Sequence, residues 1–167
     1  MSDTAPDTST VPPPSQLWKQ LSPERKLQAA DAFWHDENAA VEQAEALLTI
    51  AQRIKFRVKS VVSMPVEKKA KQLIALPAVS EMVAARLLVA YHLVHQRPMM
   101  GAFLDALGIK HEEGLISEED IQPPDAGKLK AAAQTLSASY PAEDVTVYLS
   151  TLTWQDPNTW GGLAESL

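Results

Sequence analysis

The residues best suited to chemistry form a cationic stretch near the middle of the chain. Seven of the fifteen Lys and Arg residues lie in it: Arg53, Lys55, Arg57, Lys59, Lys68, Lys69 and Lys71. On a helical wheel Ile54, Val58 and Val61 point inward, and Phe56 then falls on the outer, basic face. An exposed aromatic ring among cations is suited to docking an acidic partner or stacking on a base. The alternative is a solvated helix face whose Phe56 is covered by the next helix.

A second set of candidate residues consists of histidines. His92 and His95 are three residues apart, so they project from one side of a helix together with Glu81. Two imidazoles and a carboxylate can bind a metal ion or transfer protons. The spacing specifies no further ligand, however, and the carboxylate-and-histidine pairs of di-metal bundles are missing. We therefore predict ordinary surface histidines, no metal site and no cofactor.

Other motifs of catalysis are missing from the sequence. There is no Gly-rich phosphate loop, no nucleophile elbow and no pair of catalytic carboxylates. Catalytic groups can still be assembled in space from distant residues. The sequence therefore favours a non-catalytic protein without excluding an enzyme.

A turn between two apolar segments carries the most specific local motif. The run Lys71-Gln72-Leu73-Ile74-Ala75-Leu76-Pro77-Ala78-Val79-Ser80 and the following Ala84-Ala85-Arg86-Leu87-Leu88 resemble the helix-hairpin-helix motif of DNA-binding proteins. The resemblance covers residues 71–88 alone. It implies that backbone N–H groups of the hairpin bind a phosphate. The nucleic-acid candidates are then Lys68, Lys69, Lys71, Ala78 and Ser80.

The hairpin departs from that family at two positions. Ala78 and Ser80 stand where the family has glycines, which let the backbone approach a phosphate. The alternative interpretation is two core helices separated by Pro77, with Ser80 capping the second helix.

Two further segments are distinctive in composition. Acidic side chains crowd the stretch after Gly108: Glu112, Glu113, Glu118, Glu119 and Asp120. Their spacing does not match a calcium loop, so we predict a solvated loop, or one folded against the basic face within one chain or across a dimer. Trp154 and Trp160 flank a Pro-containing turn near the C-terminus, and we predict that they fix this segment to the core.

Composition and charge restrict the class of protein. The chain has 167 residues, of which 46% are hydrophobic, and a net charge of −6. An acidic chain is poorly suited to neutralising phosphates, so general nucleic-acid binding is disfavoured. Cysteine is absent, which excludes disulfides and thiolate chemistry. Residues 1–14 do not resemble a signal peptide, and we predict a cytoplasmic protein.

Hydrophobic spacing and start signals predict the elements that position these residues. Helices are expected over residues 23–34, 37–62, 65–74, 79–95, 97–107, 125–136 and 141–152, with a short turn after 156. Ser22 and Asp36 are the expected N-caps of the first two. Residues 53–59 also alternate as a strand would, but the helical period begins long before them.

The spine of the core is the expected helix over residues 79–95. Its central run, residues 82–94, is apolar almost all round, as in a buried helix, and is too short and too interrupted to span a membrane. Leu73 and Phe103 are predicted to be buried, as is Leu87 or Leu88. Arg86 interrupts this run, and a charge there is costly unless it is paired. We therefore expect a salt bridge from Arg86 to an acid on another helix.

The fold class predicted from the sequence is all-α. Residues 1–16 are expected to be a disordered tail, and residues 17–167 a single domain built as a compact bundle of six or seven helices. A short α-solenoid of helix pairs is the alternative. The expected function is an intracellular, non-catalytic interaction module that binds a protein partner or itself. Its candidate residues are Arg53, Phe56, Arg57 and Lys59. Nucleic-acid binding through the hairpin is the alternative function.

Overall fold

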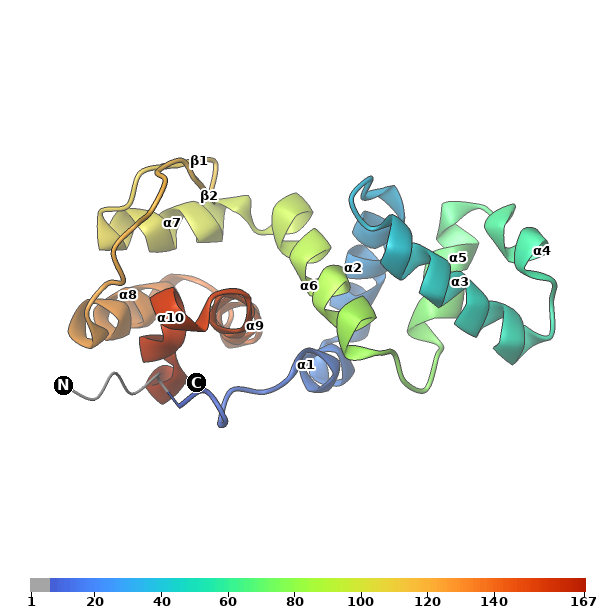
Figure 1. Ribbon diagram of the computed structural model, residues 1–167, viewed down its shortest axis with the longest axis horizontal. Helices are drawn as coiled ribbons and strands as arrows, with labels where there is room; N and C mark the ends of the chain where they lie inside the picture. Colours follow the sequence, from blue (N-terminus) through green and yellow to red (C-terminus); the bar gives the residue numbers. More distant parts are fainter. Residues whose placement is uncertain (1–6) are drawn as a thin grey trace. The chain divides into compact units, whose positions relative to one another are not determined.

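Helices make up nearly all the regular structure of residues 7–167, which the computed structural model describes (Figure 1). This range holds ten α-helices, one 3-10 helix and two strands of two residues each. The predicted all-α class is confirmed. The predicted number of helices was too low, because the short helices α1 and α4 were not expected as separate elements and α10 was expected only as a turn.

Contacts between residues divide the chain into two compact units. The α1–α6 unit is Pro14–His95, and the α7–α10 unit is Gln96–Leu167 together with the N-terminal segment up to Pro13. The single domain expected over residues 17–167 stays a prediction. Each unit is described by itself below.

The α1–α6 unit is organised around α2 and α6. Its helices are α1 Pro14–Gln20, α2 Pro23–His35, α3 Ala40–Ile54, α4 Val58–Val62, α5 Val66–Ile74 and α6 Glu81–His95. Helix α2 packs against both α5 and α6, and α1 and α3 also pack against α6. Phe33, Ile50 and Leu73 from α2, α3 and α5 are fully buried, as are Leu87 and Leu88 of α6. The predicted burial of Leu73 is confirmed, and of Leu87 and Leu88, of which one was predicted to be buried, both are.

Helix α6 differs at its ends from the buried spine that the sequence predicted. Met82 is 48% exposed and Val94 is 60% exposed, so only the middle of the helix is enclosed. In this middle section Arg86 lies beside Glu42 of α3, with Nε 3.5 Å from Oε1. The predicted ion pair to another helix is therefore confirmed, and it offsets the desolvation of the guanidinium.

Only some of the helix starts and N-caps agree with those predicted from the sequence. Pro23 opens α2 as expected, but the hydroxyl of its N-cap Ser22 accepts a hydrogen bond from the Arg25 guanidinium instead of capping the helix. Asp36 was predicted to be the next N-cap, yet α3 begins four residues later, at Ala40. The Asp36 carboxylate instead accepts from the Asn38 N–H at 2.9 Å, which stabilises the turn before α3.

The α7–α10 unit is built around α8. Its elements are α7 Arg97–Leu107, β1 His111–Glu112, β2 Leu115–Ile116, α8 Ala126–Ser139, α9 Ala142–Gln155, α10 Pro157–Trp160 and a 3-10 helix over Gly161–Ser166. Helix α8 packs against α7, α9 and the 3-10 helix. The strands pair antiparallel, His111 with Ile116 and Glu112 with Leu115. This small hairpin lies alongside α7 (Figure 1).

Aromatic side chains form the centre of the α7–α10 unit. Phe103 is fully buried, as predicted, and its ring lies 5.7 Å from that of Tyr148 and 5.9 Å from that of Trp160. Burial raises the pKa of the Tyr148 phenol. Trp160 is itself buried. The expectation that Trp160 fixes the C-terminal segment to the core is confirmed.

The N-terminal segment is more ordered than the sequence suggested. The expected disorder of residues 1–6 lies outside the described residues. Val11 is buried, and the Trp154 indole donates a hydrogen bond to the Pro12 carbonyl at 2.9 Å. Helix α1 begins at Pro14, so the boundary predicted at residue 16 moves to residue 13. Within residues 7–167, no helix combines the length and apolar character needed to cross a membrane.

Candidate functional site

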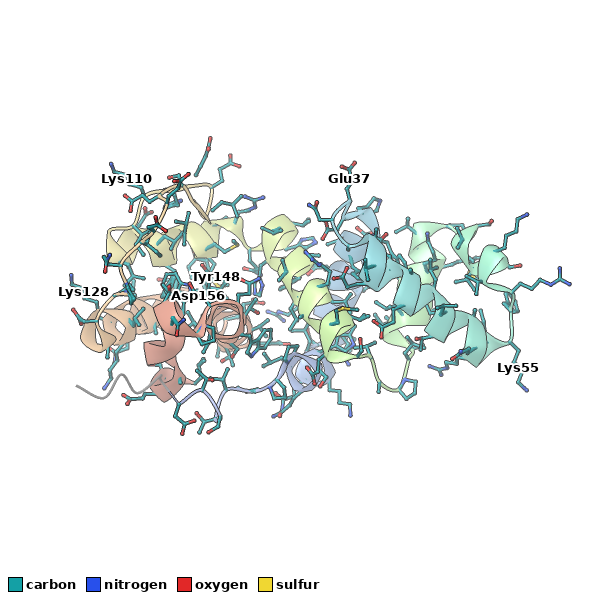
Figure 2. The ribbon with its side chains drawn as sticks, viewed as in Figure 1. Glu37, Lys55, Lys110, Lys128, Tyr148 and Asp156 are labelled. Atoms are coloured by element: carbon teal, nitrogen blue, oxygen red, sulfur yellow. The ribbon has the colours of Figure 1, made fainter. Side chains whose placement is uncertain are left out.

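The predicted basic face is a projecting turn, which we name the basic tip. It consists of Arg53, Lys55, Phe56, Arg57, Val58, Lys59 and Val62. Helix α3 ends at Ile54, and Lys55 adopts a left-handed conformation with φ 58° and ψ 38°. The Lys55 and Phe56 N–H groups both bond to the Ala51 carbonyl, which closes the helix. The Lys55 side chain points away from the ribbon (Figure 2).

This turn corrects two predictions about the same stretch. The helix expected to run to Val62 is broken, because α4 starts only at Val58 after the extended Arg57. The strand alternative for residues 53–59 is also wrong. The break rotates α4 relative to the helical wheel, so Val61 is fully buried while Val58, expected to be buried, is 38% exposed. Val61 therefore anchors α4, and Val58 remains at the surface.

The tip combines apolar exposure with positive charge. Phe56 is 53% exposed and Val62 is 50% exposed, so the alternative in which the next helix covers the Phe56 ring is wrong. The four surrounding cations are all exposed: Arg53, Lys55, Arg57 and Lys59. In the part of the chain that the structure describes, no ion pair neutralises these four side chains. The tip therefore offers an apolar contact surrounded by uncompensated cations.

The three lysines of α5 do not form a matching cluster. Lys68 is exposed, whereas Lys69 is half-buried with its Nζ 5.1 Å from the centroid of the Trp34 ring. Lys71 forms an ion pair with Glu67 at 3.3 Å. Cation–π and ion-pair contacts within the unit thus occupy two of the three lysines.

The Pro77 turn forms an irregular connection between α5 and α6. Ala78 and Ser80 are exposed, and the Ser80 hydroxyl accepts a hydrogen bond from the Val83 N–H at 3.2 Å. Ser80 therefore caps α6, as the alternative interpretation of the hairpin predicted. A small cavity of about 140 Å³ lies against the turn, and Lys19 and Lys26 are among its lining residues.

The two candidate metal ligands of α6 do not share an environment. His92 is buried and His95 is exposed, although both rings lie beside Tyr91, with centroid distances of 5.7 Å and 5.6 Å. Glu81 at the start of α6 accepts a hydrogen bond from the Ser15 N–H at 3.0 Å. The prediction of a surface position is wrong for His92. Residues 7–167 contain no group of three or more His, Asp or Glu placed to hold a metal ion.

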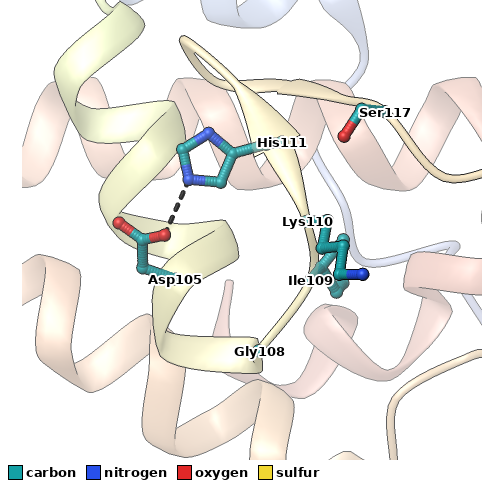
Figure 3. A pocket seen from close by; sticks show the side chains of 6 residues that line it. All are labelled: Asp105, Gly108, Ile109, Lys110, His111 and Ser117. Atoms are coloured by element: carbon teal, nitrogen blue, oxygen red, sulfur yellow. Dashed lines mark hydrogen bonds and ion pairs between the residues drawn. The ribbon is translucent and has the colours of Figure 1, made fainter.

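A histidine–aspartate pair that the sequence analysis missed lies in the α7–α10 unit (Figure 3). His111 Nε2 is 2.7 Å from the Asp105 carboxylate, and the Gly114 N–H donates to His111 Nδ1 at 3.1 Å. Because Nδ1 accepts, the ring carries its proton on Nε2 and donates it to Asp105. Gly101 makes room for this ring, since a Cβ there would lie 3.0 Å from His111 Cε1.

The surroundings of this pair favour a structural role. An open cavity of about 490 Å³ is lined by Asp105, His111, Lys110 and Ser117, among others. Both nitrogens of His111 are engaged by groups of the protein, so neither is available to a substrate in this arrangement. The pair instead clamps the β1–β2 hairpin to α7. Asp105 and His111 are six residues apart across a turn, and no motif marks such a pair.

The acidic segment after α7 is an ordered hairpin with its carboxylates in solvent. All five side chains are exposed: Glu112, Glu113, Glu118, Glu119 and Asp120. Leu115 and Ile116 between them are also exposed, at 44% and 38%. The prediction of a solvated loop took no account of these two apolar residues.

Comparison of the chain with protein-family models, with curated proteins and with solved structures found no match.

Proposed function

We propose that this protein is a non-catalytic binding module whose basic tip binds an acidic segment of a protein partner. The observation that carries the proposal is the 53% exposure of Phe56 among four exposed cations without an ion-pair partner. Aromatic and Arg side chains are the residue types that dominate binding energies at protein interfaces. The surrounding charges accelerate encounter with an acidic partner and select against basic ones.

The left-handed turn at Lys55 supports this assignment. It separates Phe56 from both α3 and α4, so the ring projects from a backbone that two helices hold in place. Buried Val61 anchors the second of these helices. A preorganised anchor loses little conformational entropy on binding, which favours affinity.

A titration with an acidic peptide tests the proposal. The probe is a synthetic peptide in which Glu residues flank a Leu-Ile pair, followed by fluorescence anisotropy. Phe56→Ala should weaken binding about tenfold or more, as expected for an anchor residue. The matched control is Leu48→Ala, which truncates an exposed apolar side chain within α3, outside the basic tip.

Charge provides the second arm of this experiment. Replacing Arg53, Arg57 and Lys59 together by Gln should weaken binding and reduce its salt dependence, because exposed charges are screened by salt. Lys128→Gln, at an exposed lysine of α8, is the control. Binding that is unaffected by both the Phe56 and the charge variants would contradict the proposal.

Non-specific binding of nucleic acid is the second candidate function. One observation favours it: Lys19 and Lys26 line the small cavity against the Pro77 turn, where a phosphate would be held. Its test is a gel-shift titration with duplex DNA at about 150 mM salt. Affinity tighter than about 1 µM that falls steeply with salt would favour this function over the first.

A further inference from the structure

The β1–β2 hairpin and the residues after it form a second surface, which we name the acidic hairpin. Its exposed members are Glu112, Glu113, Leu115, Ile116, Glu118, Glu119 and Asp120. Like the basic tip, it combines exposed apolar side chains with charged side chains of one sign, but here the charge is negative. Each surface places exposed apolar side chains between uniformly charged ones.

Several contacts hold the acidic hairpin in one conformation. Gly114 adopts φ +85°, and a Cβ at this position would lie 2.7 Å from the Met100 Cβ, so the turn packs directly on α7. The Arg97 guanidinium donates to the Glu113 carbonyl at 3.3 Å. Together with the His111–Asp105 clamp, these contacts present Leu115 and Ile116 to solvent on a fixed backbone.

We infer that the acidic hairpin of one copy of this protein docks on the basic tip of a second copy. The inference rests on the proposed function, because it names the partner of the same basic tip. Leu115 and Ile116 supply an apolar surface that covers the exposed side chains of Phe56, Val58 and Val62. The flanking carboxylates neutralise the cations around Phe56, so both surfaces lose their uncompensated charge in one contact.

The contact joins two different surfaces of the chain. In a closed dimer, each copy docks its acidic hairpin on the basic tip of the other, so two contacts form. In an open chain, each pair of neighbouring copies shares one contact. Each surface is a single turn with few apolar residues, so the interface is small, and small interfaces are weak and transient. Self-association is therefore expected to increase with protein concentration and to weaken with salt.

Sedimentation velocity on the full chain tests this inference. In about 50 mM salt, the average mass of the wild-type protein should rise between about 10 µM and about 1 mM, and it should return to that of the monomer in about 500 mM salt. A tip variant carries Arg53→Gln, Arg57→Gln and Lys59→Gln. A hairpin variant carries Glu112→Gln, Glu118→Gln and Glu119→Gln. Each variant alone should stay monomeric or associate at least tenfold more weakly than the wild type.

The mixture of the two variants is the decisive sample. The tip variant keeps an intact acidic hairpin, and the hairpin variant keeps an intact basic tip. An equimolar mixture should therefore restore a 1:1 complex and nothing larger. Far-UV circular dichroism identical to the wild type shows that both variants are folded.

Two results would overturn the inference. A wild-type protein that stays monomeric at about 1 mM in low salt excludes the contact, since even weak interfaces are populated there. A mixture that stays monomeric even at about 1 mM in low salt, while the wild type associates, assigns association to other surfaces, because a single hairpin–tip contact should be populated at that concentration. In both cases the acidic-peptide titration reports separately on the basic tip. Peptide binding without self-association leaves the proposed function in place and excludes the second copy as partner.

Discussion

The two units of the chain differ most in charge. The α1–α6 unit carries eleven Lys and Arg against eight Asp and Glu, a net charge of +3. The α7–α10 unit with the N-terminal segment carries four against thirteen, a net charge of −9, and the two values give the −6 of the chain. The net charge of the whole chain therefore describes neither unit. Overall acidity therefore disfavours anionic partners at the α7–α10 unit but not at the basic tip.

The units also differ in how they present their charged turns. The acidic hairpin is tied to α7 by the His111 clamp and by the close approach of Gly114. The basic tip depends on Lys55, a residue with a side chain, in the left-handed conformation that glycine usually adopts. One turn is fixed by tertiary contacts and the other by the ends of two helices. Removing a glycine from the acidic hairpin should therefore destabilise the α7–α10 unit, whereas introducing a glycine at Lys55 should stabilise the α1–α6 unit.

The largest expected effect concerns the two cores. Phe103→Ala should lower the free energy of unfolding of the α7–α10 unit by about 3–5 kcal/mol, and Leu87→Ala that of the α1–α6 unit by about 2–5 kcal/mol. Both side chains are fully buried. Chemical denaturation followed by tryptophan fluorescence measures this, because Trp18 and Trp34 belong to one unit and Trp154 and Trp160 to the other.

The same experiment shows whether the units are independent. If each has its own core, Phe103→Ala should move the unfolding of the α7–α10 unit more than that of the α1–α6 unit. A matched control is Met82→Ala, at a half-exposed position of α6. Identical shifts of all tryptophan signals in both core variants would mean that the chain unfolds as one cooperative body.

A pair of glycine substitutions tests how the acidic hairpin is held. Gly114→Ala should destabilise the α7–α10 unit by roughly 2–3 kcal/mol, because it combines a positive φ with a Cβ 2.7 Å from Met100 Cβ. Gly108→Ala is the matched control: φ is +71°, but nothing lies within 4 Å of the added Cβ. It should cost about 1 kcal/mol, from backbone strain alone. Equal effects of the two substitutions on thermal unfolding would show that the hairpin does not pack closely on α7.

The sequence predicted the parts of this structure that depend on local periodicity. Burial of Leu87 and Leu88 follows from an apolar run of helical spacing, and the need for a partner at Arg86 follows from the cost of an unpaired charge. These inferences use residues within a few turns of one another. The exposure of Phe56 does not follow from this periodicity, because the residue lies in the turn between α3 and α4 and not on the continuous helix that the sequence predicted.

The sequence could not predict contacts that form only when separate segments of the chain pack against one another. The Asp105–His111 pair forms because the hairpin folds back along α7, and neither residue marks this. The burial of His92 likewise depends on neighbours outside its own helix. The break at Lys55 was missed for another reason. Glycine and asparagine are the usual signals of a left-handed helix end, and lysine gives none.

The smallest expected effect, and the only stabilising one, is Lys55→Gly in the basic tip. Lys55 has φ 58°, a conformation that costs a residue with a Cβ roughly 1–2 kcal/mol. Glycine avoids this strain but loses more backbone entropy on folding, by about 0.5–1 kcal/mol. The net expectation is an increase of about 0.5–1 kcal/mol in the free energy of unfolding of the α1–α6 unit, measured by denaturant titration. Arg57→Gly is the matched control, because Arg57 is extended, with φ −69°, so glycine relieves no left-handed strain there. A destabilising Lys55→Gly would mean that the lysine side chain itself supports the turn.

If the strain is instead relieved as expected, Lys55→Gly also removes one cation from the tip without disturbing Phe56. Acidic-peptide binding should then weaken only as far as the loss of one exposed charge requires, about 0.2–1 kcal/mol.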